Sequence, residues 1–280
     1  MTALREEGLR GEDAGPSDEA WAVRYVATMS DSAASGQGVP PMAAQETFWN
    51  EWNVSHLASA KRDSFQLHQR DVAEAAAARA AAALEVRRPL RILDFGCGTG
   101  WLGASLTSYG DVTGIDLSST AIEHGLREFP ELNLMVGDFA DVRLTGLFDV
   151  IISSDVIAHV ADQQAYIERV ADLLRPGGTF VLMTQNGFVW RRSSQLRPQG
   201  PGQIRNWPSL KVLRTMLDKK FVIVRVGSIQ PAGDRGILWL LNGRWPRGGF
   251  KLLGLGDGWK AFLERILIGR DFIIEARRQD

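Results

Sequence analysis

The chain has little cysteine and no long hydrophobic run. Cys97 is the single cysteine among 280 residues, which excludes a disulfide framework and any metal site built on several cysteines. No stretch approaches the roughly 20 consecutive apolar residues that a membrane-spanning helix needs. The first 20 residues lack the apolar core of a secretion signal. These absences predict a soluble protein of the cytoplasm.

The chain as a whole has almost no net charge, although its first two thirds are acidic and its last third is basic. The 32 basic and 33 acidic residues give a net charge of -1, so the whole chain is not a polycation built for nucleic acid. Up to Asn186 there are 14 basic and 26 acidic residues, whereas from Gly187 onward there are 18 and 7. The basic last third indicates a solvated face, an anionic substrate or surface, or attraction between the two parts.

Composition divides the chain into three parts. Residues 1–42 are rich in Gly, Ala, Ser and acidic residues and are predicted to be a mostly disordered tail, with a short helix around Trp21 and Tyr25. Residues 43–88 are predicted to form an N-terminal helical cap. This cap carries an aromatic cluster, Phe48–Trp52, and an alanine-rich helix that ends before Pro89.

Residues 89–280 alternate between short apolar runs and helical segments. Strands are predicted at 91–95, 111–116, 132–138, 148–154, 178–184, 221–229 and 271–277, and helices at 102–109, 119–128, 163–174 and 209–219. This alternation is typical of an α/β fold with a doubly wound, seven-stranded, mainly parallel sheet. Residues 229–269 are predicted to be an irregular insertion before the last strand, such as a substrate lid.

The first strand runs into a glycine-rich turn. Gly96, Gly98 and Gly100 stand at alternate positions, where bare backbone can approach a ligand and enter the next helix. Gly98, Gly100 and Gly103 also fit the dinucleotide-binding pattern. Asp94, directly before the turn, decides between the two, because a carboxylate there repels a pyrophosphate and attracts an ammonium or sulfonium group.

Acidic residues also follow the next three predicted strands. Asp116 can accept hydrogen bonds from both hydroxyls of a ribose. Asp138 and Phe139 can hold an adenine, and Ser154-Asp155 comes after the fourth strand. Open α/β sheets bind ligands at the carboxyl ends of their strands, which is where these residues are expected. Any single one of these acids can instead be a helix cap.

The motifs ILDFGCGTG, VTGIDLS, VGDF, FDVIISSDVIAHV and LLRPGGTFVLMT resemble those of class I S-adenosylmethionine-dependent methyltransferases. They are most similar to the broad type that includes the ubiquinone-biosynthesis O-methyltransferases. The resemblance covers residues 89–184. It implies a Rossmann-like methyltransferase fold, S-adenosylmethionine as the cofactor and methyl transfer as the activity.

The resemblance also implies which residues bind the cofactor. The three alternate glycines pack on its amino-acid part, Asp116 holds the ribose, and Asp138 and Phe139 hold the adenine. Arg70 matches an arginine that pairs with the methionine carboxylate in the ubiquinone type. The full set is Arg70, Asp94, Gly96, Gly98, Gly100, Asp116, Leu117, Asp138, Phe139 and Ser154.

His159 is the candidate general base, which is needed when the acceptor is a hydroxyl or a protonated amine. A structural histidine bonded to backbone is the alternative. The resembling family often has Glu-x-x-Glu-His here; Asp155 takes the first place but Ala158 replaces the second, which weakens a metal-binding interpretation. No metal is therefore expected. Cys97 is explained by the small residues that a tight bend accepts, not as a nucleophile.

The acceptor is the least defined part of the hypothesis. The insertion interleaves Trp239, Trp245 and Trp259 with arginines and lysines. Such a segment suits an anionic, partly apolar acceptor, for instance a lipid-linked or nucleotide-activated sugar, or contact with an acidic membrane surface. An ordinary lid or subunit contact explains it as well, in a monomer or a homodimer. No RNA-binding motif is present, so nucleic acid is not expected as a partner.

Three functions remain open from the sequence. Methyl transfer to a small-molecule, glycan or lipid-linked acceptor is favoured, with oxygen as the first choice of acceptor atom, nitrogen the second and carbon the third. A non-catalytic module that keeps S-adenosylmethionine as a structural ligand is the second function. A nicotinamide-dependent oxidoreductase using the Gly98–Gly103 pattern is the third.

Overall fold

The computed structural model describes residues 39–57, 63–83 and 88–280. The predicted tail lies almost entirely outside the described residues, and so does the short helix around Trp21 and Tyr25. The end of the alanine-rich helix beyond Ala83 lies outside them as well.

Seven strands form one sheet in the order β3-β2-β1-β4-β5-β7-β6. β7 runs antiparallel to both of its neighbours, and the other pairs are parallel. The prediction of a seven-stranded, mainly parallel sheet is therefore confirmed. The strands are β1 (Leu90–Phe95), β2 (Gly110–Asp116), β3 (Asn133–Val136), β4 (Phe148–Ser154), β5 (Leu174–Gln185), β6 (Phe221–Pro231) and β7 (Gly269–Arg278).

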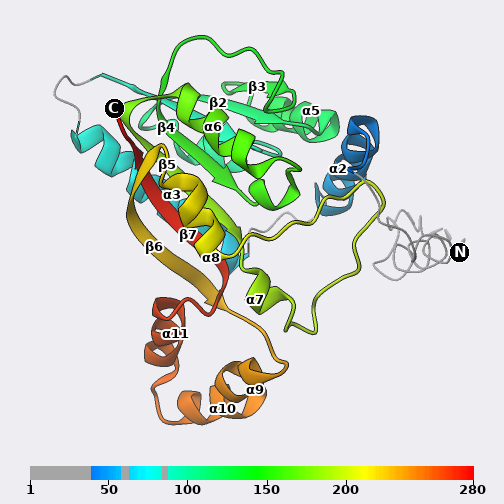
Figure 1. Cartoon of the computed structure of the whole chain (residues 1–280), viewed down its shortest axis with the longest axis vertical. Helices are drawn as coiled ribbons and strands as arrows, with labels where there is room; N and C mark the ends of the chain where they lie inside the picture. The colour runs from blue at the N-terminus through cyan, green and yellow to red at the C-terminus, as the bar shows by residue number, and fades with distance from the viewer. Residues whose placement is uncertain (1–38, 58–62, 84–87) are drawn as a thin grey trace, which may run out of the picture. The chain divides into compact units, whose positions relative to one another are not determined.

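Helices cover both faces of this sheet (Figure 1). Those before β6 are α2 (Met42–Leu57), α3 (Ser64–Ala83), α4 (Trp101–Ser105), α5 (Ser119–Glu128), the short 3-10 turn η2 (Ile157–His159), α6 (Gln163–Leu173), α7 (Gly187–Trp190) and α8 (Leu210–Leu217). Those between β6 and β7 are α9 (Ile237–Asn242), α10 (Arg244–Leu252) and α11 (Gly256–Arg265).

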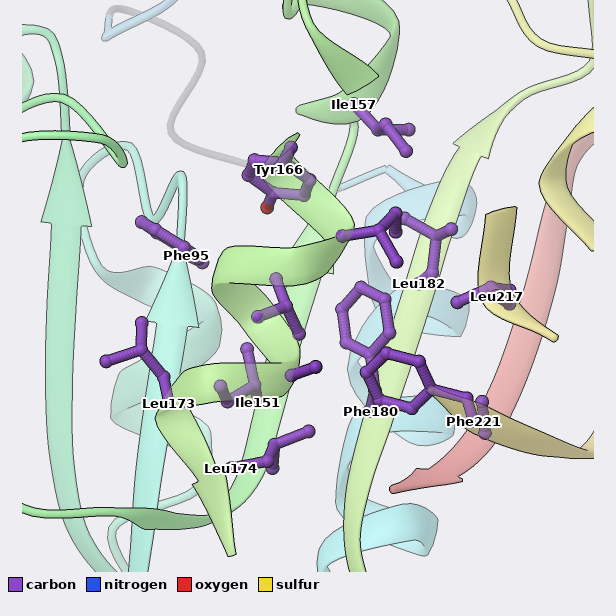
Figure 2. Close-up of a cluster of buried hydrophobic side chains, with 14 of the residues drawn as sticks. Phe95, Ile151, Ile157, Tyr166, Leu173, Leu174, Phe180, Leu182, Leu217 and Phe221 are labelled. Atoms are coloured by element: carbon purple, nitrogen blue, oxygen red, sulfur yellow. The ribbon is translucent and has the colours of Figure 1, made fainter. Parts of the chain in front are cut away.

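Successive residues of a strand point to opposite faces of the sheet, so the strands contribute to two hydrophobic clusters, one on each face. In β1, Leu93 and Phe95 join the cluster under α6 and α8, whereas Leu90 and Ile92 face the opposite cluster under α3, α4 and α5. Figure 2 shows the first cluster, in which the rings of Phe180 and Phe221 lie 5.6 Å apart. A sheet buried on both faces needs the near-continuous apolar strands that the sequence contains.

The strand order creates a crevice. β1 lies between β2 and β4, so successive crossovers leave it in opposite directions and the carboxyl ends of these strands open between them. Asp94 of β1 is in register with Ile152 of β4, and Asp116 of β2 with Val136 of β3. The acids that the sequence places at strand ends therefore meet at one edge.

Two predicted details differ in the structure. The helix predicted at 102–109 ends at Ser105. The chain then turns back into β2, whose first residue, Gly110, pairs with Leu90 of β1. The insertion 229–269 is not irregular, since it contains α9, α10 and α11. Its frequent glycines conceal the helical pattern, and tertiary contacts such as the stacked rings of Phe250 and Trp259, 4.3 Å apart, stabilise the helices instead.

Candidate functional site

A cavity of about 1050 Å³ lies at the carboxyl edge of β1, β2 and β4. Most of the residues singled out in the sequence line it. They are Asp94, Gly96, Gly98, Asp116, Leu117, Asp138, Phe139, Ser154 and His159. Gly100 lies behind this lining, and Arg70 lies away from it.

Gly96, Gly98 and Gly100 have positive φ angles of 81°, 54° and 77°, respectively, but different surroundings. A Cβ on Gly96 would lie 2.0 Å from a methyl of Val156, so this glycine allows close packing. A Cβ on Gly100 would press on Leu132 and Leu134 at 3.1 Å. A Cβ on Gly98 would meet no atom within 4 Å. Gly98 is therefore the one of the three whose bare backbone faces open cavity.

Asp116 ties this turn to the end of β2. One of its carboxylate oxygens accepts the N–H of Gly98 at 2.7 Å, and the other accepts the N–H of Ser118 at 2.8 Å. Burial raises the pKa of Asp116, and these backbone hydrogen bonds oppose that rise. A carboxylate has about four acceptor positions, so each oxygen can still accept a hydroxyl from a ligand.

Asp94 is 1% exposed and its carboxylate accepts the N–H of Gly103, in the first turn of α4, at 3.1 Å. Burial raises its pKa to about 7. Together, Asp94 and Asp116 occupy backbone donors of the glycine turn and of the helix start. A pyrophosphate needs such donors free and without a carboxylate beside them, so the turn is unsuited to a dinucleotide.

Asp138 and Phe139 form the far wall of the cavity after β3. The Asp138 carboxylate accepts the N–H of Ala140 at 2.8 Å and so shapes the turn. The Phe139 and Tyr166 rings pack edge-to-face at 5.1 Å, and both line the cavity.

Arg70 does not line the cavity. Its side chain is 40% exposed and pairs with Asp71 at 2.9 Å and Glu74 at 3.6 Å. The preceding residue, Gln69, is 4% exposed and donates from its amide to Ser154 Oγ at 2.8 Å and to Asp155 Oδ2 at 2.9 Å. One position along a helix turns the side chain by about 100°, so α3 presents Gln69 to the cavity and Arg70 to solvent.

His159 lies in η2 at the side of the cavity. Its Nδ1 is 2.7 Å from the carbonyl oxygen of Ile204, and its ring packs edge-to-face with that of Trp49 at 4.8 Å between centroids. Burial lowers the pKa of His159, which favours the neutral ring. A carbonyl can only accept, so the neutral ring carries its proton on Nδ1 and keeps a lone pair on Nε2.

Asp155, which the sequence places after the fourth strand, has an acidic neighbour at this edge that the sequence did not indicate. Asp155, at a φ of 61°, accepts hydrogen bonds from Gln69 and, at 2.8 Å, from Gln185. Asp271 of β7 is 1% exposed, and burial and the adjacent Asp155 carboxyl raise its pKa. Only the position of β7 beside β5 brings these two acids together, so no local pattern could have revealed their pairing.

The cavity is covered by segments other than the insertion. Trp49 and Trp52 of α2 line it, and so does Ile204 from the loop between α7 and α8. The Asn206 N–H donates to the Ala158 carbonyl at 2.8 Å and holds this loop over η2. No described side chain from residues 229–269 is in the lining. The insertion therefore does not line the cavity in this structure, and its role as a substrate lid stays a prediction.

Within the described parts of the chain, no three His, Cys, Asp or Glu side chains are grouped so that they could hold a metal ion. Cys97 is buried and burial raises the pKa of its thiol, so it is a poor nucleophile.

Comparison with known proteins agrees with this geometry. Residues 66–220 match the family model described as a methyltransferase domain, which is more than half of the chain. The chain belongs to this methyltransferase family. The resemblance inferred from the motifs is thereby confirmed.

Among curated relatives, a ubiquinone biosynthesis O-methyltransferase of Xanthomonas oryzae pv. oryzae (strain PXO99A) is 37% identical over 103 residues. That match covers 34% of this chain and 43% of the relative, so it spans less than half of either protein.

Two solved structures share the fold. One is the N-methyltransferase NodS from Bradyrhizobium japonicum WM9 in complex with S-adenosyl-l-homocysteine, with 15% identity, a TM-score of 0.55, and coverage of 82% of this chain and 98% of that one. The other is magnesium protoporphyrin IX methyltransferase from Synechocystis PCC 6803 with bound SAM, with 16% identity, a TM-score of 0.55, and coverage of 88% and 100%.

Proposed function

We propose that this chain binds S-adenosylmethionine in the cavity and catalyses methyl transfer to a hydroxyl oxygen of a small-molecule, glycan or lipid-linked acceptor. The observation that carries the proposal is the pairing of the glycine turn with two carboxylates. Gly98 donates to Asp116 and Gly103 donates to Asp94, so the turn offers negative charge where a dinucleotide site offers free N–H groups.

The residues present fit the cofactor along its length. Open space beside Gly98 accommodates the methionine part, near the Asp94 carboxylate. Asp116 keeps acceptor positions for the ribose hydroxyls, with Leu117 beside it in the lining. The Phe139 ring and Asp138 suit the face and the amino group of adenine. When bound, S-adenosylmethionine supplies an activated methyl group on a positively charged sulfur.

His159 is the proposed proton acceptor for the hydroxyl. The Ile204 carbonyl holds Nδ1 and leaves Nε2 as the basic atom of a ring that burial keeps neutral. The ring lines the cavity, beside the Trp49 and Trp52 side chains that would enclose an acceptor. Positioning the acceptor oxygen against the methyl group and excluding water would supply most of the rate enhancement beyond that of the base.

Oxygen is preferred as the acceptor atom because the curated relative is named for O-methylation, and His159 provides the base that a hydroxyl acceptor needs. Nitrogen is the second choice, since the solved neighbour NodS is an N-methyltransferase. A cytoplasmic location, which the single cysteine predicts, belongs to the same proposal.

Calorimetry followed by a turnover assay tests the proposal. We expect the full chain to bind S-adenosylhomocysteine and not NADH, and to transfer label from methyl-labelled cofactor to a component of fractionated metabolites, lipids or glycans. The Asp116→Ala variant should bind S-adenosylhomocysteine about 1.5–3 kcal/mol more weakly. Tight NADH binding without S-adenosylhomocysteine binding would indicate an oxidoreductase. Binding without product from any fraction would indicate a non-catalytic module.

A further inference from the structure

The insertion between β6 and β7 exposes an unusual amount of apolar surface. Among the residues that the structure describes, eight of the eighteen large hydrophobic side chains with high exposure lie between positions 237 and 266. Leu252 is 90% exposed and Leu253 72%. Large exposed apolar side chains concentrated in one segment are typical of an interaction site.

These exposed side chains belong to helices that are packed in place. Leu238 and Leu263 are 0% and 1% exposed and form the inner side of the insertion. The Trp259 indole N–H donates to the Leu241 carbonyl at 3.0 Å, which joins α11 to α9. Ser228 of β6 donates to the Glu264 carbonyl at 2.8 Å, which joins α11 to the sheet. The insertion thus has its own buried contacts, and the outward leucines are additional to them.

Cations accompany the apolar side chains. Residues 237–266 contain five basic and two acidic residues, within a last third that is basic as a whole. Lys251 stands directly before the exposed leucine pair, and Lys251, Lys260 and Arg265 are all exposed. Apolar side chains flanked by lysine and arginine are complementary to a surface with an apolar interior and anionic head groups.

The insertion cannot cross a bilayer but can lie on one. Among the described helices, none is long and apolar enough to span a membrane. α9, α10 and α11 have 6, 9 and 10 residues, and so rise only about 9–15 Å each. Short helices with an apolar side and cationic flanks lie in the plane of the lipid interface.

The insertion stands at the same edge of the sheet as the cavity. It leaves the carboxyl end of β6 and returns at the start of β7, and Figure 1 shows the three helices together beyond that end of both strands. Arg270, the second residue of β7, lines the cavity, and one of its terminal nitrogens donates to Gln230 at the root of the insertion at 3.3 Å. A surface that binds α9–α11 would therefore lie near the cavity.

We infer that α9–α11 form a docking surface for an anionic phospholipid membrane. Leu252 and Leu253 enter the boundary between head groups and acyl chains. Lys251, Lys260 and Arg265 contact the head groups. Docking itself does not depend on the proposed reaction. Its corollary, which does rest on the proposed function, is that the membrane presents a lipid-linked acceptor to the cavity.

Vesicle sedimentation with the full chain tests this inference. One set of vesicles contains phosphatidylcholine alone, and the other contains about 30% phosphatidylglycerol as well. We expect the chain to sediment with the anionic vesicles and to be released by high salt. A variant combining Leu252→Glu and Leu253→Glu should lose at least about tenfold in vesicle affinity.

The matched control combines Leu126→Glu on α5 with Val212→Glu on α8, where the side chains are 43% and 47% exposed. It adds the same charge at two less exposed apolar positions outside the insertion, and it should sediment like the unmodified chain. Equal vesicle binding by both double variants overturns the inference, as does the absence of binding to anionic vesicles. A dimer that the Leu252 and Leu253 changes dissociate, without vesicle binding, overturns it in favour of contact between copies. Affinity for S-adenosylhomocysteine, measured in parallel, reports separately on the proposed function.

Discussion

The carboxyl edge of β1–β4 and the insertion between β6 and β7 each place side chains where they are energetically costly, but of opposite kinds: buried carboxylates at the first and exposed leucines at the second. At the first edge, carboxylates are buried but bonded: Asp116 accepts two backbone N–H groups and Asp94 accepts one. At the insertion, apolar side chains are left in water, and Leu252 is 90% exposed. Both cost free energy in the isolated chain. The difference suggests that the first region is built around a small polar ligand and the second around an extended apolar partner.

The sharpest way to test the first region is Gly98→Val. The new side chain would extend into open cavity beside Asp116, and we expect it to abolish S-adenosylhomocysteine binding in calorimetry while the protein stays folded. Gly177→Val is the control, because Gly177 also has a positive φ, 73°, and no atom within 4 Å of a Cβ, but is outside the cavity lining. Equal binding by both variants would show that Gly98 does not face the cofactor.

The His159→Asn variant distinguishes a catalytic role of His159 from a structural one. Asparagine can still donate toward the Ile204 carbonyl but cannot accept a proton at the Nε2 position. We expect turnover to fall by about 100-fold or more while S-adenosylhomocysteine affinity changes little. Because burial lowers the pKa of His159, turnover of the unmodified enzyme should be constant above pH 6.5 and fall on acidification below it. A lower melting temperature with unchanged turnover would instead assign His159 a structural role.

Two leucines test whether the insertion separates stability from docking. Leu263, 1% exposed, packs inside it, and Leu263→Ala should lower the free energy of unfolding by about 2–5 kcal/mol. Leu253, 72% exposed, touches little, and Leu253→Ala should change it by no more than about 0.5 kcal/mol. Urea denaturation measures both. A large loss from Leu253→Ala would mean that the outward leucines are part of the folded core and not of a docking surface.

The smallest expected effect concerns the charge of Asp94. Its pKa is raised to about 7, so it is mainly ionised at pH 8 and mainly protonated at pH 6. A ligand ammonium or sulfonium favours the ionised form, so affinity should fall by up to about tenfold between these two pH values. Asp94→Asn should weaken binding at pH 8 and remove this pH dependence, as calorimetry at several pH values would show. The same slope in the variant would exclude Asp94 as its source.

Local patterns predicted most of the cofactor side of the cavity. Glycines, acids and strand ends lie next to one another in the sequence, and a parallel sheet brings successive strand ends to one edge whatever the details of packing. Nine of the predicted residues accordingly line the cavity. The positions of Gly100 and Arg70 were not predictable in this way. A Cβ on Gly100 would meet Leu132 and Leu134 from a later part of the chain, and the direction of Arg70 depends on how α3 is rotated.

The amino-acid sequence by itself determined the seven strands, the fold class and the family, because periodicity and short motifs act over neighbouring residues. The tertiary structure alone decided which residues complete the site. Ile204 reaches His159 across 45 positions, Gln69 reaches Asp155 across 86, and Asp271 meets Asp155 only because β7 inserts beside β5. It also showed that the insertion does not line the cavity and that its leucines are exposed. Contacts between distant segments depend on packing of the whole chain, and no local pattern encodes them.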